Sequence, residues 1–353
     1  MKKLPFKRRD KAQKAIPTRI TNETVAEHRE RILAGGRRFK YPMQYARHRL
    51  VFNTVIITIA ALILIAVVGW WQLYPAQNTS NFFYRVTRVL PFPVASVDGE
   101  SVRYSDYLMY YNSSAHYLQQ SEQVNLQSED GKRQIDDVKR KSMNNAITDT
   151  YAQKLARQLN ISVGEDLVNK AVSDARDTVN GRISQETYDA SALSVLGWSP
   201  DEYRQAAKNN LIRHNVAYAI DTAAQQKEVQ AAQLLQAPDA DLDKIATQLG
   251  GEGNSKATIG VSGLVPRNNQ DGGLSAAALK LEKGKISPAV KTTTGDGYYF
   301  VKLLDKNDTQ ISYTYLCIPL TRFSEQLAAL KKEAKVHEYI SIPAADSQKT
   351  IQQ

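Results

Sequence analysis

Residues 51–73 have the sequence VFNTVIITIAALILIAVVGWWQL, an almost uninterrupted apolar run. The chain carries no charged residue between Arg49 and Arg85. A transmembrane helix needs about 20 apolar residues at 1.5 Å rise to cross a hydrocarbon core of about 30 Å. Because this run has 23 residues, the sequence predicts a single-pass membrane protein with one transmembrane helix over residues 50–74.

Residues at both ends of the run fit the two faces of a lipid bilayer. Arg47 and Arg49 lie on the N-terminal side, and Trp70, Trp71 and Tyr74 form an aromatic belt on the other. A buried core helix is less compatible, because such helices rarely run so long without a polar face. A cleavable signal peptide has a short basic start and a shorter apolar run, whereas 49 residues precede this one. We therefore expect a membrane anchor that contacts lipid through these five residues.

The formal charge of +10 is unevenly distributed along the 353 residues. Residues 1–49 hold 15 Lys and Arg against 4 Asp and Glu, which leaves 31 basic and 32 acidic residues for the rest. This balance excludes a globally basic nucleic-acid-binding domain, and we expect no nucleic-acid partner. Under the positive-inside rule, the basic tail is cytoplasmic and the C-terminal domain lies outside the plasma membrane. Within the tail, Asn22 and the pair Gly35-Gly36 predict a helix over residues 23–33.

Several classes of chemistry are not supported by the sequence. Cys317 is the single cysteine and there are five His, so neither an intrachain disulfide nor a metal site with ligand spacing is predicted. The chain has no Gly-x-Ser-x-Gly motif. Its Gly pairs at 250–251 and 272–273 lack the Lys-Ser/Thr of a nucleotide site. We therefore expect no cofactor and no metal.

The region after the apolar run begins with helical patterns. An amphipathic segment, FFYRVTRVL at residues 82–90, lies in the predicted linker, and Asp98-Gly99 predicts a hairpin. Ser105 is expected to cap the next helix. Ser199-Pro200 marks a helix boundary, because Ser caps and Pro fits the first helical position. Helices are predicted over 106–120, 132–159 and 163–179, and on either side of LGWSP within 185–223.

The pattern changes after about residue 225 to a small α+β unit. Helices are predicted over 228–235, 241–249 and 323–339, and strands over 289–293, 298–304 and 311–318. The predicted domains are a basic cytoplasmic tail (1–49), a transmembrane helix (50–74), a linker (75–93), a helical domain (94–223), an α+β domain (224–305), a C-terminal strand and helix packing on that domain (306–342) and a disordered tail (343–353).

Two groups of segments carry a resemblance to known families. VASVDGESVRYSDY at residues 94–107 and LGWSPDEYRQAAKNNLIRHNVA at 196–217 resemble the helical N-terminal chaperone module of SurA-like and PrsA-like extracytoplasmic foldases. The segments IGVSGLV at 259–265, ALKLEKGKIS at 278–287 and GYYFVK at 297–302 resemble the C-terminal half of a parvulin-type (PpiC) prolyl isomerase domain. The resemblance implies a mostly α-helical chaperone module followed by a small α+β parvulin-like domain.

The parvulin resemblance also implies a peptide groove with altered residues. Helical, Gln-rich sequence around residues 223–236 replaces the strand that carries the first family His, and Tyr299 stands at the second. Parvulins usually have a Phe at one position of the groove, which corresponds to Leu274 here. They have a Met or Leu at another, which corresponds to Gln270. A hairpin between 298–304 and 311–318 would bring Tyr315 beside Tyr299, either facing the groove or as a pair of cross-strand core tyrosines.

Together these features predict a membrane-anchored extracytoplasmic folding factor. It would bind unfolded, proline-containing or newly translocated polypeptides, with weak or lost rotamase activity. Isomerisation needs a shaped pocket rather than a nucleophile, so an active peptidyl-prolyl cis-trans isomerase stays an alternative. A structural envelope protein that binds one fixed partner is the third hypothesis.

Overall fold

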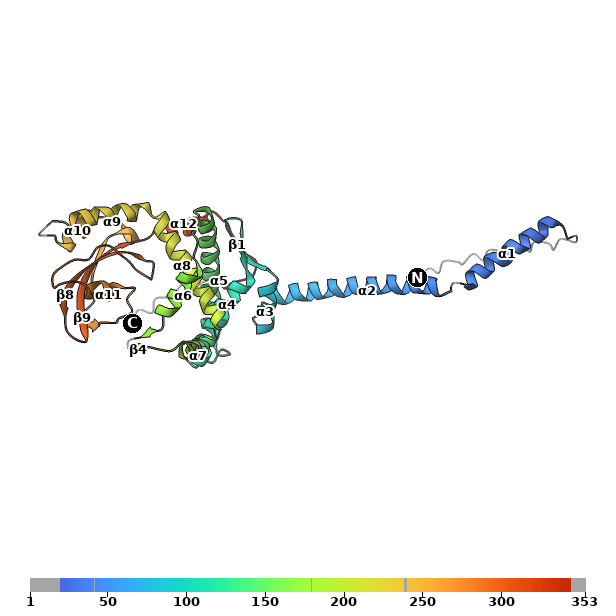
Figure 1. Cartoon of the computed structure of the whole chain (residues 1–353), viewed down its shortest axis with the longest axis horizontal. Helices are drawn as coiled ribbons and strands as arrows, with labels where there is room; N and C mark the ends of the chain where they lie inside the picture. The colour runs from blue at the N-terminus through green and yellow to red at the C-terminus, as the bar shows by residue number, and fades with distance from the viewer. Residues whose placement is uncertain (1–19, 41, 179, 238–239, 344–353) are drawn as a thin grey trace. The chain divides into compact units, whose positions relative to one another are not determined.

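The computed structural model describes residues 20–40, 42–178, 180–237 and 240–343. These form two compact units, residues 1–72 and residues 73–353, each of which is described by itself (Figure 1). The ends of the chain at 1–19 and 344–353 lie outside the described residues. Residues 1–19 of the predicted basic tail (1–49) and residues 344–353 of the predicted disordered tail (343–353) therefore lie outside the described residues.

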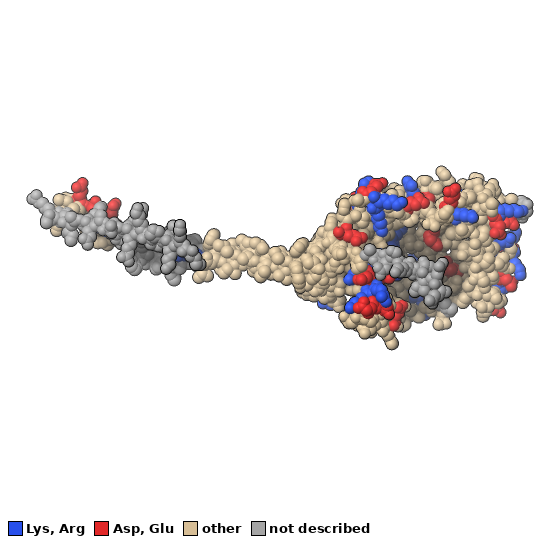
Figure 2. All heavy atoms as spheres, turned by 180° about the vertical axis from the view of Figure 1, so that it is seen from behind, with Lys and Arg blue, Asp and Glu red and all other residues tan. Residues whose placement is uncertain are grey.

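The first unit consists of helices. α1 spans Asn22–Lys40, and α2 spans Pro42–Leu73. The prediction that Gly35-Gly36 ends the first helix is wrong, because a helix can continue through Gly at a cost of about 1 kcal/mol per residue. Residues 49–73 of α2 are long and apolar enough to cross a membrane, and their apolar stretch is not buried in the structure. Figure 2 shows this stretch without charged side chains.

The predicted anchor residues have different surroundings. Trp70 and Trp71 are more than half exposed, as expected for an aromatic belt. Tyr74 instead packs against a protein core, and its hydroxyl donates a hydrogen bond to the Pro93 carbonyl over 2.7 Å. The prediction of Tyr74 as a lipid-facing residue is therefore corrected to a packing residue. The side chain of Arg47 lies outside the described residues.

The second unit begins with a helix and a hairpin. α3 spans Asn81–Val89, β1 spans Pro93–Val97 and β2 spans Glu100–Arg103. The predicted turn at Asp98-Gly99 is confirmed, with φ values of 49° and 82° that suit a two-residue hairpin. α4 spans Tyr104–Gln120, so Ser105 lies inside the helix rather than at its cap.

The helical module continues with a long helix and three shorter ones. α5 spans Glu129–Gln158 and is capped by Ser128. α6 spans Glu165–Asp174, α7 spans Gln185–Leu196 and α8 spans Pro200–Ile220. The boundary at Ser199-Pro200 is confirmed, with a capping box between Ser199 and Glu202. The predicted helix 163–179 is too long, because α6 gives way to a hairpin of β3 (Asp177–Thr178) and β4 (Gly181–Arg182).

The α+β module contains a mixed set of short helices around one antiparallel sheet. Its elements are α9 (Thr222–Leu234), α10 (Leu242–Leu249), the 3₁₀ helix η1 (Gly253–Ser255), β5 (Thr258–Val261), β6 (Val265–Pro266), α11 (Leu274–Leu279), β7 (Val290–Lys291), β8 (Gly297–Lys306) and β9 (Gln310–Pro319). The sheet order is β5-β9-β8-β7, and β6 also pairs with β9. The predicted hairpin is confirmed, because β8 and β9 pair along their length.

Alternating residues of β8 and β9 build two separate cores. Tyr298, Phe300, Leu316 and Ile318 pack with residues of α9 and α10. Tyr299, Val301, Leu303, Ile311 and Tyr313 pack with Leu274 and Ala278 of α11 on the other face (Figure 1). A strand places successive side chains on opposite faces, so one helix layer covers each side of the sheet.

The C-terminal segment returns to the helical module. α12 spans Arg322–Lys332, and β10 spans Val336–Glu338 and pairs antiparallel with β1. Leu327 and Ile340 lie in the core that contains Val94, Tyr104 and Ile147. The prediction that all of residues 306–342 packs on the α+β domain is therefore correct for β9 and wrong for the part after it. The predicted helix 323–339 ends early because Ala334 is left-handed (φ 51°) and because β1 offers an unpaired edge to β10.

Candidate functional site

The two tyrosines of the predicted groove lie on one face of the sheet. In the β8–β9 register, Tyr299 pairs with Cys317, and Val301 pairs with Tyr315. The rings of Tyr299 and Tyr315 are 5.5 Å apart between centroids, with an interplanar angle of 53°. Leu274 belongs to the same core cluster, against which Tyr315 packs. Three of the four predicted groove residues therefore meet on the α11 side of the sheet.

The hydroxyl of Tyr299 is held by an acidic group at the β7–β8 turn. Tyr299 Oη donates to Asp296 Oδ2 over 2.8 Å, and the hydroxyls of Thr292 and Thr294 donate to Oδ1 over 2.6 Å each. Burial would raise the pKa of Asp296, but these three hydrogen bonds bring it below its ordinary value. Burial and hydrogen bonds to Cys317 and Asp296 raise the pKa of Tyr299. Tyr299 is therefore a neutral hydrogen-bond donor at physiological pH.

The exposure of these residues favours packing over an open groove. Tyr299 is 8% exposed and Leu274 is 6% exposed. This burial fits the alternative of cross-strand core tyrosines for Tyr299, whereas Tyr315 is half-buried. Gln270 lies in the loop before α11, where its Nε2 donates to the Asn268 carbonyl over 3.3 Å.

Tyr315 is in tight contact with the neighbouring strand β5. A Cβ built on Gly260 would lie 2.3 Å from Cζ of Tyr315, and Gly260 pairs with Tyr315 in the register of β5 and β9. Only Gly leaves room for the ring over this strand. Next to it, Tyr313 Oη donates to Asp271 Oδ2 over 2.6 Å, which ties the sheet to the start of α11.

A cleft that the sequence did not indicate lies where α8 and α9 meet β7 and β8. Its volume is about 780 Å³, within the range of ligand pockets in proteins. Glu228 and Lys291 are the charged residues of its lining, and the other lining residues are apolar, aromatic or carry side-chain amides. The lining residues are Ile161, Asn215, Tyr218, Ala219, Gln225, Glu228, Val229, Ala289, Lys291 and Tyr298. They come from four separate segments, so no local motif could have identified them.

Aromatic groups form the fixed wall of this cleft. The rings of Tyr218 and Tyr298 are 5.1 Å apart at an interplanar angle of 73°, and Tyr218 Oη donates to the Gly297 carbonyl over 2.6 Å. Lys291 Nζ lies 5.4 Å from the Tyr218 ring centroid and 5.7 Å from that of Tyr298. Val229 on the α9 side is 53% exposed. The cleft therefore offers apolar, aromatic and cationic surface to a chain-like ligand.

Hydrogen bonds and close packing connect the helical module and the α+β module near the cleft. Asp221 Oδ2, at the junction of α8 and α9, accepts the backbone N–H groups of Thr321 and Arg322 over 2.8 and 3.0 Å. His214 lies against Gly295, where a Cβ would approach its ring to 2.2 Å. Burial and the nearby Arg213 lower the pKa of His214, opposed by Asp296.

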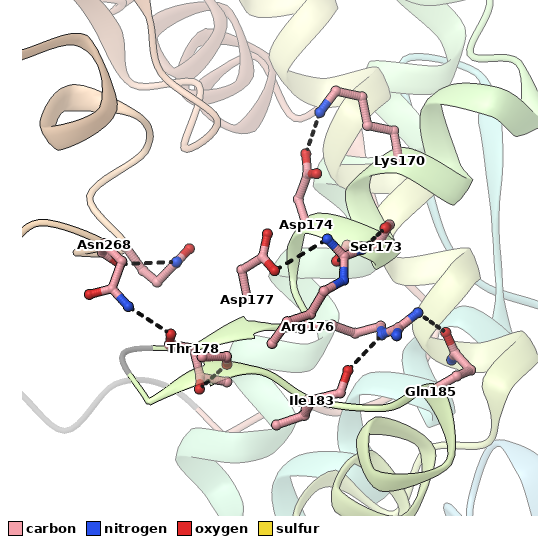
Figure 3. Close-up of polar contacts among 12 residues, drawn as sticks. Lys170, Ser173, Asp174, Arg176, Asp177, Thr178, Ile183, Gln185 and Asn268 are labelled. Carbon is pink, nitrogen blue, oxygen red and sulfur yellow. Dashed lines mark hydrogen bonds and ion pairs between the residues drawn. The ribbon is translucent and has the colours of Figure 1, made fainter. Parts of the chain in front are cut away.

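The β3–β4 hairpin makes a second connection between the modules. Asn268 Nδ2, in the loop between β6 and α11, donates to the Thr178 carbonyl over 3.0 Å (Figure 3). Arg176 holds the base of the hairpin, because its Nε donates to the Ile183 carbonyl over 3.0 Å. Asp177 and Arg182 form an ion pair across the two strands. The hairpin is therefore an ordered arm of the helical module that reaches the α+β module.

The helical module has polar features of its own. A second cavity of about 480 Å³ has charged residues of both signs in its lining, including Arg103, Asp106 and Glu202. Asp149, which is 2% exposed, accepts hydrogen bonds from Tyr110 and Asn209 and pairs with Arg213 at 3.3 Å. Burial raises the pKa of Asp149 despite these partners. The carboxylate joins α4, α5 and α8 through one buried network.

The second unit thus joins a helical module to a small α+β module, with a cleft where α8 and α9 meet β7 and β8. Residues 43–217 match the family model described as a SurA-like N-terminal domain. Residues 43–217 therefore contain a SurA-like N-terminal domain, which supports a SurA-like or PrsA-like folding factor. No curated protein and no solved structure matches the chain.

Proposed function

We propose that this protein is a membrane-anchored extracytoplasmic chaperone that holds unfolded or newly translocated polypeptides in the cleft between its two modules. The observation that carries the proposal is the SurA-like match over residues 43–217 together with a cleft of about 780 Å³ walled by Tyr218 and Tyr298. Apolar and aromatic surface binds many sequences, because burial of apolar area is non-directional. Client choice is therefore broad.

The proposed topology follows from α2 and from the charge of the tail. Residues 49–73 span the plasma membrane, the basic residues before them stay in the cytoplasm, and residues after 73 face outward. This arrangement keeps the cleft beside polypeptides that leave the translocation machinery. If residues 49–73 were instead a cleavable signal, cleavage after them would release the rest of the chain from the membrane fraction.

The test is suppression of aggregation of a chemically unfolded client by the full chain in lipid nanodiscs. Val229→Asp places a charge on exposed apolar surface of the cleft and is expected to weaken holding of the client. Leu193→Asp is the matched control, because Leu193 is 59% exposed on α7 and does not line the cleft. Equal loss in both variants, or no holding by the unaltered chain, would contradict the proposal.

Prolyl isomerisation is the second candidate function, supported by Tyr299 and Tyr315 on one sheet face. Turnover of a chromogenic proline tetrapeptide by the same preparation tests it. We expect weak or no turnover, because Tyr299 and Leu274 are buried. Turnover that falls in Tyr299→Phe would show an active isomerase instead. One stoichiometric partner in a crosslinking pull-down, without client holding, would favour a structural envelope protein.

A further inference from the structure

Within the part of the chain that the structure describes, no element covers an apolar stripe on α3. Phe82, Val89 and Leu90 are 67%, 80% and 51% exposed. Phe82, the half-buried Val86 and Val89 follow the spacing i, i+4, i+7, which lines one face of a helix, and Leu90 follows directly after the last helical residue. The opposite face is occupied, because Phe83 and Tyr84 pack against the core of the helical module and Thr87 is buried. The exposed stripe is therefore separate from the residues that hold α3 in place.

The position of α3 in the chain ties this stripe to the end of the apolar helix. Leu73, the last residue of α2, is 1% exposed in the same core against which Phe83 and Tyr84 pack. Tyr104 Oη donates to the Leu73 carbonyl over 2.7 Å, and Tyr74 Oη donates to that of Pro93. Leu73, the last residue of the apolar run, and Tyr74, which directly follows it in the sequence, are thus held by the module that carries α3.

The charge of the segment around α3 and the size of its apolar stripe indicate which kind of partner it binds. Residues 74–97 contain Arg85 and Arg88 and no Asp or Glu, a composition suited to anionic head groups. A nine-residue helix is only about 14 Å long at 1.5 Å rise. Its stripe is too small for the roughly 800 Å² that each partner buries in a standard protein interface. An interfacial helix instead needs only one apolar face in the head-group region.

We infer that Phe82 and Val89 of α3, together with Leu90 directly after it, insert into the lipid head-group region of the bilayer that α2 crosses. This inference rests on the proposed membrane anchoring. It makes α3 a second, peripheral contact that holds the chaperone module against the outer leaflet. The ligand class is an anionic phospholipid surface.

The test uses nitroxide labels on single cysteines in the full chain with Cys317→Ser, reconstituted into vesicles of phosphatidylcholine and phosphatidylglycerol. Accessibility to oxygen and to a water-soluble nickel complex is measured for Phe82→Cys and Val89→Cys. Leu193→Cys on α7 is the aqueous control, and Leu62→Cys within α2 reports the anchor itself. We expect loss of nickel accessibility at positions 82 and 89 relative to position 193.

The outcomes separate the two proposals. If position 62 is in lipid while positions 82 and 89 stay as accessible to nickel as position 193, the α3 inference is overturned and the anchor stands. If position 62 is accessible to nickel, the anchoring proposal fails first. Each position is labelled alone, and the far-ultraviolet circular dichroism of each variant is compared with that of the unaltered chain. A variant whose spectrum shows loss of structure is misfolded and is replaced by Leu90→Cys.

Discussion

The carboxylate of Asp221 accepts the backbone N–H of Thr321 over 2.8 Å, although the two residues are 100 positions apart. The same side chain caps α9 by accepting the N–H of Ala224 over 3.0 Å. One acidic residue thus fixes both the turn from α8 to α9 and the start of α12.

Asp221→Ala is expected to lower the free energy of unfolding by about 2–4 kcal/mol, because a cap contributes about 1 kcal/mol and hydrogen bonds to a charged group about 1.5–3 kcal/mol. Denaturant titration measures this change. Asp241→Ala is the control, since Asp241 caps only α10, and it should cost about 1 kcal/mol. Equal losses in both variants would show that Asp221 has no role beyond capping.

Gly260→Ala should distort the contact between β5 and Tyr315. The added Cβ would lie within 2.3 Å of the ring, and overpacking of this kind costs about 1–3 kcal/mol. Thermal or denaturant unfolding reports the loss. The double variant with Tyr315→Leu removes the ring atoms in conflict and should recover part of it. A double variant whose loss equals the sum of the two single losses would refute steric conflict as the cause.

His214 should make the stability depend on pH. Its pKa is lowered by burial, so the unfolded state binds the proton first as pH falls. The stability is therefore full above the unfolded pKa of about 6.5 and decreases as pH falls through that value toward the lowered pKa of the folded state. Unfolding midpoints measured between pH 8 and pH 5 should fall less in His214→Asn than in the unaltered chain.

The control for this pH dependence is His337→Asn, because His337 is exposed. Arg213 and Asp296 surround His214 with opposite charges and stay unchanged in both variants. An identical pH slope for His214→Asn and the unaltered chain would argue against His214 as the titrating group.

Asp149→Ala should be among the most destabilising changes in the helical module. Removing the carboxylate leaves Arg213, Asn209 and Tyr110 without their shared acceptor, and breaking a buried ion pair costs about 3–5 kcal/mol. Denaturant unfolding of the full chain measures it. Asp137→Ala is the matched control, because Asp137 is 61% exposed in its pair with Arg140. A loss below about 1 kcal/mol for Asp149→Ala, as at exposed pairs, would contradict the network.

Local signals in the sequence predicted the elements whose shape depends on a few adjacent residues. Asp98-Gly99 indicated a hairpin and Ser199-Pro200 a helix start, and both are present because positive φ values and capping are decided within two or three residues. The apolar period of β8 and β9 indicated their pairing in the same way. Tyr299 and Tyr315 could then be placed on one face, because a strand alternates its side chains.

Contacts between segments that are far apart in the sequence could not be predicted in this way. Nothing near Val336 indicates that residues 336–338 leave the helical pattern and pair with β1 about 240 residues earlier. The cleft was missed for a similar reason, since Tyr218, Val229 and Lys291 meet only after α8, α9 and β7 have packed. Ser105 was misplaced as a cap because Tyr104 already belongs to α4 and is buried with its hydroxyl on Leu73.

The pairing of β1 with β10 determines the order in which the chain can complete its structure. β1 pairs with β2 on one side, and its other edge stays unpaired until residues 336–338 have been synthesised. The α+β module, contained within residues 222–319, can acquire its internal sheet before that point. The last strand made therefore completes the sheet that the first strand of this unit began, and premature termination of translation would leave one edge of β1 open.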